Sequence, residues 1–285
     1  MLTDTLTFPH LFRLCVILAD FGKIFTHKVT HRKDDLCYKI WQPIRAGPAR
    51  HINQKGSSKS PKPSERVHGW CEGRICHITN DNNKLISLSD TVKVEEIRED
   101  QQYGGYRVTL IAMLGKAKIH LQVDCGFGDA ITPEASVHDF PTLLDFPAPR
   151  LRMYPKETVV AEKFEAIVKI GEANSRMKDF YDLWVLGCDF SFSGAVLAMA
   201  IENTFNRRRT HFPIGSPEAF KATFIQNPMK QTQWQAFVRK TRFVKVDKDF
   251  GKTIDLLRIF LLPPLESIQK SKSFKMTWPP NGPWQ

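Results

Sequence analysis

The sequence has 285 residues and a hydrophobic content of 42%, enough to bury the core of one large domain or two modest ones. Lysine and arginine outnumber acidic residues by 41 to 30, an excess of 11, which favours a polyanionic partner such as nucleic acid or a nucleotide. Six scattered cysteines without a secretory signal argue for reduced thiols and against a disulfide scaffold. The apolar run at residues 11–19 is too short to span a membrane, so we expect a soluble, cytoplasmic protein.

The first 85 residues differ in composition from the rest of the chain. They hold 14 lysines and arginines against 7 acidic residues, a net charge of +7, and six of the nine histidines. Residues 51–65 are rich in Lys, Ser, Pro and Gly, which is typical of a flexible linker. Beyond them lie four side chains of zinc-ligand type whose spacing is irregular, so a zinc site is the less favoured interpretation of His68, Cys71, Cys76 and His77. We predict that residues 1–85 form a divergent basic region that is disordered or not homologous to a known fold.

An antiparallel hairpin is predicted from Arg107 to Asp124. Apolar and polar residues alternate on both sides of Gly115–Lys116, which supplies the turn. The second strand carries Asp124 at its end, on the face shared with His120 and Gln122 and just before a glycine-bearing loop. Because strand ends followed by such loops are frequent sites of chemistry, Asp124 is a candidate functional residue.

The rest of the chain shows helical periodicity. A helix is expected over 158–170, closed by Gly171, and a second from Ser175 to Gly187. Further helices are predicted over 195–208, around 234–238 and around 256–260, the last of them ended by Pro263–Pro264. The proline-rich tail at 265–285 is expected to lie loosely on the surface.

Lys163 stands out in the first of these helices. Its neighbours three and four positions away are apolar, so its ammonium emerges from the apolar stripe, while Glu162, Glu165 and Lys169 are expected to face solvent. Burying an unpaired ammonium is costly. Lys163 therefore either extends past the stripe into water or meets an anion in a cleft.

A charged stripe runs along the next predicted helix, formed by Arg176, Lys178, Asp179 and Asp182 at spacings of three and four. The stripe is either part of a functional cleft or a solvated face, whose ion pairs contribute only about 0.3–0.5 kcal/mol each. For an isolated helix the solvated face is the favoured interpretation. The run Arg207–Arg209 has two equally favoured interpretations. Its arginines could bind phosphates, or they could complement the C-terminal end of a helix.

Four ordered segments resemble one known family. They are YGGYRVTLIAMLGKAKIHLQVDCGFGDAITP, LLDFPAPRLRMYPKETVVAEKFEAIVKIGEANSRMKDFYDLWVL, NTFNRRRTHFP and QWQAFVRK. Over about residues 91–264 they are similar to the AbiEii/AbiGii toxins, which are nucleotidyltransferase-like proteins. The helix with AEKFEA and the helix with SRMKDFYDL carry the resemblance most specifically.

The resemblance implies an α+β fold, with an incomplete DNA polymerase beta-like nucleotidyltransferase sheet followed by a helical C-terminal half. It also implies a toxin of an abortive-infection, phage-defence system, with a cognate antitoxin, Mg²⁺ as cofactor and a nucleoside triphosphate (NTP) as substrate. Characterised relatives add nucleotides to tRNA ends, which makes an RNA acceptor such as tRNA an expectation here. We accordingly divide the chain into a basic region (1–85), a sheet portion (86–150), a helical portion (151–264) and a flexible tail (265–285).

Site residues carry over by position. Lys163 matches the lysine that contacts the triphosphate, and Asp179 matches the acidic residue of the family's Arg-x-Lys-Asp motif. Arg176 and Lys178 belong to the same motif and are expected to bind the nucleotide. Asp124 occupies the place of a further catalytic carboxylate and is the expected metal ligand.

The family's first motifs, a Gly-Gly or Gly-Ser turn and an Asp-x-Asp, are not found in residues 1–90, where neither Gly-Gly nor Asp-x-Asp occurs. A frameshift, a rearrangement or a misassigned start would account for such a replaced region. Asp124 alone would hold a divalent cation weakly, since these sites rely on several oxygen ligands. We expect a nucleotidyltransferase-like toxin whose activity is in question, with a non-catalytic remnant that binds an antitoxin or RNA as the alternative.

Overall fold

The computed structural model describes residues 12–15, 85–99, 103–139, 150–240 and 247–285. The described residues fall into two compact units, each considered by itself: the strands as far as Met153 form the first, and residues 129–136 with 154–285 form the second. The predicted linker at 51–65 lies outside the described residues, as do the zinc-ligand types His68, Cys71, Cys76 and His77. The predicted domain boundaries stay a prediction.

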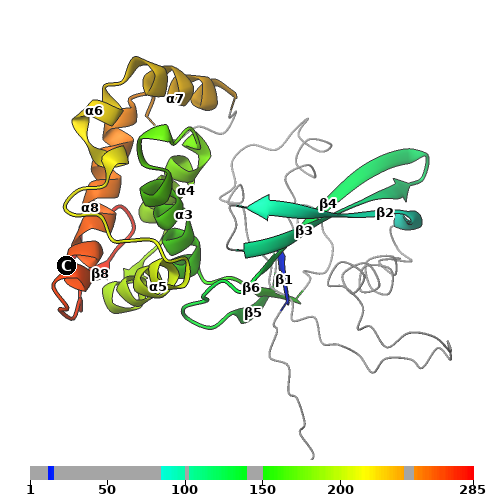
Figure 1. Ribbon diagram of the computed structural model, residues 1–285, viewed down its shortest axis with the longest axis horizontal. Coiled ribbons are helices and arrows are strands. Elements are labelled where there is room, and N and C mark those ends of the chain that lie inside the picture. Colours follow the sequence, from blue (N-terminus) through cyan, green and yellow to red (C-terminus); the bar gives the residue numbers. More distant parts are fainter. Residues whose placement is uncertain (1–11, 16–84, 100–102, 140–149, 241–246) are drawn as a thin grey trace, which may run out of the picture. The chain divides into compact units, whose positions relative to one another are not determined.

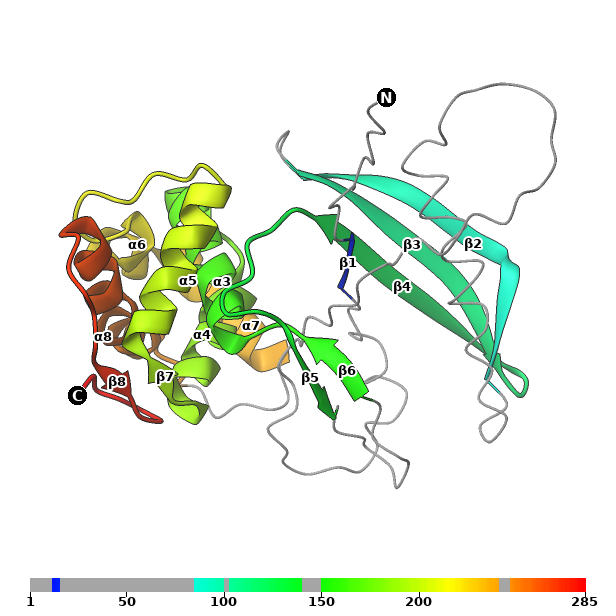
Figure 2. The ribbon, with the colours of Figure 1, turned by 90° about the horizontal axis from the view of Figure 1, so that it is seen from below.

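The first unit is built around a four-stranded antiparallel sheet. Its strands are β1 (Phe12–Cys15), β2 (Leu85–Glu99), β3 (Tyr103–Leu114) and β4 (Ala117–Phe127), in the order β1-β4-β3-β2. Figures 1 and 2 show β2, β3 and β4 side by side. The β3–β4 pair is the predicted hairpin, which is confirmed, and its turn contains Gly115 at φ 59°, a conformation that glycine adopts without steric cost.

Alternation along the hairpin separates its two faces. Val108, Leu110 and Ala112 of β3 are buried, as is Ile119 of β4, whereas the alternate position His120 is exposed. This period of two is the pattern that one buried face imposes on a strand. Two short strands, β5 (Ser136–Asp139) and β6 (Arg150–Met153), pair in a separate small sheet.

The second unit is helical, and Figure 1 shows its elements in chain order. They are α3 (Lys156–Ile170), the 3₁₀ turn η1 (Gly171–Ala173), α4 (Met177–Asp189), β7 (Phe192–Ser193), α5 (Gly194–Arg207), the 3₁₀ turn η2 (Glu218–Phe220), α6 (Ala222–Ile225), α7 (Pro228–Lys240), α8 (Phe250–Gln269) and β8 (Thr277–Trp278). Helix α3 packs against α4 and α5, and α8 packs against the same two helices. Strands followed by helices make the fold α+β, as predicted.

Aromatic side chains fill the core of the helical unit. Phe164 of α3 lies against Phe205 and Phe220, with ring centroids 5.8 and 6.1 Å away, and Phe180 of α4 meets Phe250 edge-on at 5.3 Å. All five rings are fully buried. Such pairs stabilise beyond the area they bury, and they fix α3 and α4, which carry the candidate site.

Helix α4 does not end at Gly187, so that expectation is wrong. The helix continues to Asp189, and a Cβ atom at Gly187 would lie 3.1 Å from the Leu256 side chain. Glycine is present because α4 and α8 approach closely here, and tertiary packing outweighs its low helix propensity.

Helix α8 passes through Pro263 and Pro264 to Gln269, so the expected end at the proline pair is also wrong. Burial of Pro264 and Leu265 supplies the packing energy that sustains the helix despite the lost amide donors. The following segment packs into the core instead of lying loosely on the surface. Trp278 is buried, donates to the Gly187 carbonyl at 2.7 Å and pairs β8 with β7, and Trp284 is buried too.

Within the described ranges, no helix is long and apolar enough to cross a membrane.

Candidate functional site

Lys163 of α3 meets two carboxylates of α4. Its Nζ lies 2.9 Å from Asp179 Oδ1 and 2.6 Å from Asp182 Oδ2, and its side chain is only 16% exposed. Residues three apart share a face of a helix, so α4 presents both carboxylates to the same ammonium. The sequence left two possibilities for Lys163, extension into water or contact with an anion. The structure shows contact with anions.

Asp179 and Asp182 are almost fully buried, so the interpretation of the α4 stripe as a solvated face is wrong for its two carboxylates. Each carboxylate also has a second cation: Arg176 Nε lies 2.8 Å from Asp179 Oδ2, and Lys178 Nζ lies 2.7 Å from Asp182 Oδ2. Packing of α4 against α3 buries these two carboxylates. Four ion pairs join Lys163, Arg176, Lys178, Asp179 and Asp182, and we call these five residues the α3–α4 network.

The network keeps a surplus of positive charge. Lys163, Arg176 and Lys178 supply three cations against two carboxylates, which leaves one positive charge within the set. The side chains of Arg176 and Lys178 are 58% and 52% exposed, so both can meet a ligand from solvent. The arrangement is a buried anionic layer beneath a cationic surface.

Electrostatics keep Lys163 protonated. Burial lowers the pKa of Lys163, but the carboxylates of Asp182 and Asp179 outweigh that effect and raise the pKa above the ordinary lysine value. A group held in this way is a fixed positive charge and not a proton acceptor. Its chemistry is to neutralise and orient an anion.

Asp124 belongs to the first unit and has its own partners. Its two carboxylate oxygens accept from Arg107, Oδ1 from Nε at 2.8 Å and Oδ2 from Nη2 at 2.9 Å. Gln122, on the same face of β4, donates to Oδ1 at 3.3 Å. The structure thus brings Lys163, Arg176, Lys178 and Asp179 together, and it places Asp124 in a separate bidentate pair.

A second buried cluster lies on the opposite side of α3. Arg208, directly after α5, has Nη1 2.8 Å from Glu165 Oε2, with Glu162 at 3.7 Å and Asp129 at 3.4 Å from Nη2. The Thr210 hydroxyl donates to Glu165 as well. Glu162 and Glu165 are therefore buried and not on the solvent face, and that prediction is wrong because the end of α5 covers them.

Arg208 is paired with these carboxylates, so the prediction that the arginine run binds phosphate does not hold for Arg208. Burial lowers the pKa of Arg208, but Glu162, Asp129 and Glu165 outweigh it and raise the pKa above its ordinary value. Arg207 and Arg209 on either side are exposed.

The described residues do not fit a divalent metal. No group of three or more His, Cys, Asp and Glu side chains in the described part of the chain is arranged to hold one. Asp124, the predicted ligand, directs both oxygens to a guanidinium, and the carboxylates of the α3–α4 network are each paired with two cations. Since Mg²⁺ sites draw on several free oxygen ligands, we derive no step through a metal from these residues.

One comparison with known proteins decides the family. The protein-family model described as Nucleotidyl transferase AbiEii toxin, Type IV TA system, matches residues 74–256. This match covers more than half of the 285 residues. The chain belongs to the AbiEii toxin family. It is a nucleotidyltransferase-like toxin of a type IV toxin–antitoxin system, and the family implies a cognate antitoxin. No curated protein and no solved structure matches the chain.

The AbiEii match starts at residue 74, ahead of the change in composition near residue 85. All five members of the α3–α4 network lie inside the match, as does Asp124. The family thus covers both units, and the catalytic and binding roles of these residues stay predictions.

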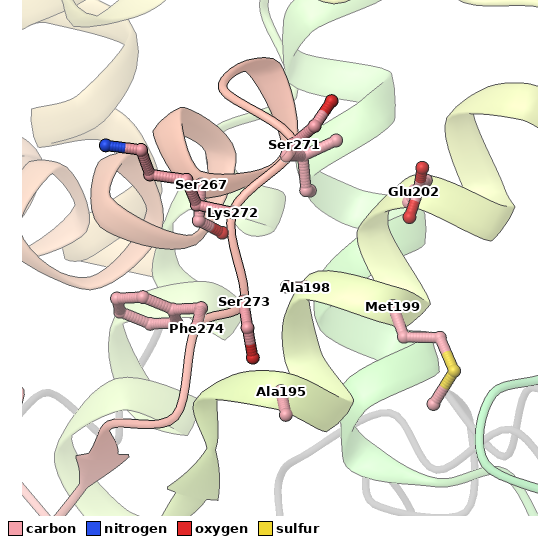
Figure 3. Close-up of a pocket in the computed structure, with 10 residues that line it drawn as sticks. Ala195, Ala198, Met199, Glu202, Ser267, Ser271, Lys272, Ser273 and Phe274 are labelled. Atoms are coloured by element: carbon pink, nitrogen blue, oxygen red, sulfur yellow. The ribbon is translucent and has the colours of Figure 1, made fainter.

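A groove of about 370 Å³ lies elsewhere on this AbiEii protein, between α5 and the end of α8 with the chain that follows it. Figure 3 shows Ala195, Ala198, Met199 and Glu202 of α5 on one wall, and Ser267, Ser271, Lys272, Ser273 and Phe274 on the other. Its lining is about equally polar and apolar in character, and it shares no residue with the α3–α4 network.

Three residues of the site were not singled out for it by the sequence. Asp182 was recognised only as part of the stripe, although its spacing of three from Asp179 was the available signal. Asn174 and Lys230 gave no signal. The Lys230 ammonium of α7 donates to the Asn174 carbonyl at 2.7 Å, and Asn174 Oδ1 accepts from the Arg176 amide at 2.8 Å, and no local pattern predicts such contacts.

Proposed function

We propose that this chain binds the triphosphate of an NTP at the exposed cations of the α3–α4 network and transfers a nucleotide to an RNA acceptor such as a tRNA end. The reaction would act in the cytoplasm as the toxic step of phage defence, opposed by the cognate antitoxin. The observation that carries the proposal is the fixed ammonium of Lys163 beneath two half-exposed cations.

Each residue has a distinct part in this proposal. Lys163 provides a permanent charge that needs no reorganisation when a phosphate arrives. Arg176 offers a planar fork suited to phosphate oxygens, and Lys178 a compact point charge. Asp179 orients Lys163 and Arg176 together, since it pairs with both. Asp124, paired with Arg107, is proposed to be the second catalytic carboxylate.

General chemistry supports this division of labour. Phosphoryl-type transfer depends on neutralising charge and aligning the reactants, and much less on covalent help from the protein. Mg²⁺, the proposed cofactor, would neutralise further phosphate charge when it arrives bound to the phosphates of the NTP. The residues described here contribute binding and orientation.

Transfer is tested by incubating the chain with each labelled NTP, tRNA and Mg²⁺ and measuring label in the RNA. The proposal expects incorporation by the wild-type chain and its loss in Lys163→Ala. Lys178→Ala should also reduce incorporation, and Lys221→Ala is its matched control, because Lys221 is a half-exposed lysine that pairs with Glu218 away from the network. Incorporation that Lys163→Ala leaves unchanged would contradict the assignment.

A second candidate is a non-catalytic protein that binds its antitoxin or RNA. Two observations favour it: Asp124 and Asp179 are each paired with an arginine, and residues 1–90 contain no Asp-x-Asp. Binding of an NTP without incorporation of label into any RNA would support this candidate over the transferase.

A further inference from the structure

Lys230 of α7 is a buried lysine that the proposed chemistry does not use. It is 6% exposed, its Nζ donates to the Asn174 carbonyl at 2.7 Å, and the same atom lies 4.9 Å from the centroid of the Phe224 ring. Among the residues that the structure describes, no carboxylate lies within ion-pair distance of it. Its partners are therefore a carbonyl oxygen and a ring face.

Such a burial is costly for the fold. An ammonium removed from water without a counter-charge is strongly disfavoured, and a ring face together with one carbonyl offsets that cost only in part. A methionine would fill similar space without that cost. The lysine at position 230 thus makes a contact that an apolar side chain could not make.

The contact falls on the turn that starts α4. Asn174 is fully buried, its amide donates to the Gly171 carbonyl at 3.1 Å, and its side-chain Oδ1 accepts from the Arg176 amide at 2.8 Å. The Arg176 carbonyl in turn accepts from the Asp179 amide at 2.9 Å. Lys230, Asn174, Arg176 and Asp179 are linked in one chain of hydrogen bonds.

Arg176 lies in the same turn, directly before α4. Arg176 precedes α4 with φ −81° and ψ 66°, outside the helical region, and its own side chain does not cap the helix. Its backbone is held by Asn174 on one side and by the first turn of α4 on the other. Its guanidinium then reaches Asp179 at 2.8 Å.

We propose that Lys230 is a positioning residue for the nucleotide site: by holding the Asn174 turn, it fixes Arg176 against Asp179 with its guanidinium ready for a phosphate. The inference rests on the proposed function. Lys230 itself touches no ligand and acts through Arg176.

The test measures binding of inorganic triphosphate to the full chain by isothermal titration calorimetry. Lys230→Met, which keeps the volume and the contact with Phe224, is expected to weaken binding about tenfold, the scale of one hydrogen bond to a charged group. In the Arg176→Ala background the same substitution should have no further effect, whereas in the Lys178→Ala background it should again cost about tenfold. Such non-additivity is the signature of two residues acting together.

Gln231→Ala is the matched control. Gln231 is the next residue of α7 and also donates to a backbone carbonyl, that of Ile225 at 2.6 Å, which is not in the Asn174 turn. It should leave triphosphate binding unchanged. Circular dichroism checks that each variant folds, and Lys230→Gln, which keeps a neutral donor, replaces Lys230→Met if the latter does not fold.

Three results would overturn the inference. Unchanged binding in Lys230→Met, or an equal loss in the wild-type and Arg176→Ala backgrounds, would show that Lys230 does not act through Arg176, while the proposed function stands. Absence of triphosphate binding by the wild-type chain would remove the proposed function, and the role of Lys230 would fall with it.

Discussion

Replacing Lys163 with methionine removes the cation shared by two buried carboxylates. The side chains of Asp179 and Asp182 are 5% and 2% exposed, and both lie within 2.9 Å of the Lys163 ammonium. In Lys163→Met each carboxylate keeps one half-exposed cation but loses the one that is buried with it. The protein must then hold anionic charge in the core with less compensation.

The expected loss follows from this geometry. Removing one partner of a buried ion pair costs about 3–5 kcal/mol. Because Arg176 and Lys178 remain 2.8 and 2.7 Å from the two carboxylates, we expect the lower end, about 3 kcal/mol. For Lys178→Met, whose side chain is 52% exposed, we expect at most about 1 kcal/mol, as for surface pairs.

Urea unfolding followed by circular dichroism measures both free energies of unfolding. The double variant Lys163→Met with Asp182→Asn should recover part of the loss, since it removes one of the stranded charges. A loss below about 1 kcal/mol in Lys163→Met, or one equal to that of Lys178→Met, would refute the description of the network as buried and cooperative.

Three further predictions concern stability. Arg208→Met should lower the free energy of unfolding by about 3–5 kcal/mol, because it strands the buried Glu162 and Glu165; a urea midpoint equal to that of the wild type would contradict this. Trp278→Ala should cost about 3–5 kcal/mol by the same assay, since Trp278 is buried in the core, and a negligible change would mean that the C-terminal segment does not pack there. Because the folded pKa of Lys163 is raised above 10.5, its stabilising contribution should be complete below that pH and be lost only as pH rises through the folded value. The difference in unfolding free energy between the wild type and Lys163→Met should therefore stay constant from neutral pH up to about 10, and a decline starting near pH 8 would be inconsistent with the raised pKa.

Local patterns predicted the longer helices and one hairpin, and they missed β2 and the short strands and turns. Alternation around Gly115 predicted the β3–β4 hairpin, and apolar spacing of three and four predicted α3 and α5 to within two residues. The errors in the predicted helix ends arose where tertiary packing outweighed the local preference of a residue. Gly187 and Pro263 both favour the end of a helix in isolation. Gly187 instead lies inside α4, where it allows close contact with α8. Helix α8 continues past Pro263 because Pro264 and its neighbours are buried.

Only part of the candidate site could be predicted from the sequence, namely Lys163 and its partner Asp179. The apolar neighbours of Lys163 indicated that its ammonium would leave a buried face, and the resemblance named Asp179 as its companion. Burial of Asp182 could not be predicted, because it depends on which face of α4 meets α3. The same limit applies to Glu165, whose partner Arg208 lies 43 residues further along the chain.

The central claim is that the α3–α4 network holds a triphosphate, and equilibrium binding of a labelled NTP to charge-removed variants tests it most directly. Arg176→Ala and Lys178→Ala alter half-exposed side chains, so both variants should stay folded, and Lys221→Ala controls for loss of a similarly exposed lysine outside the network. Each of the first two is expected to weaken binding about tenfold, and their combination more strongly, with no change in Lys221→Ala. NTP binding that is equal in the wild type and in all of these variants would contradict the account.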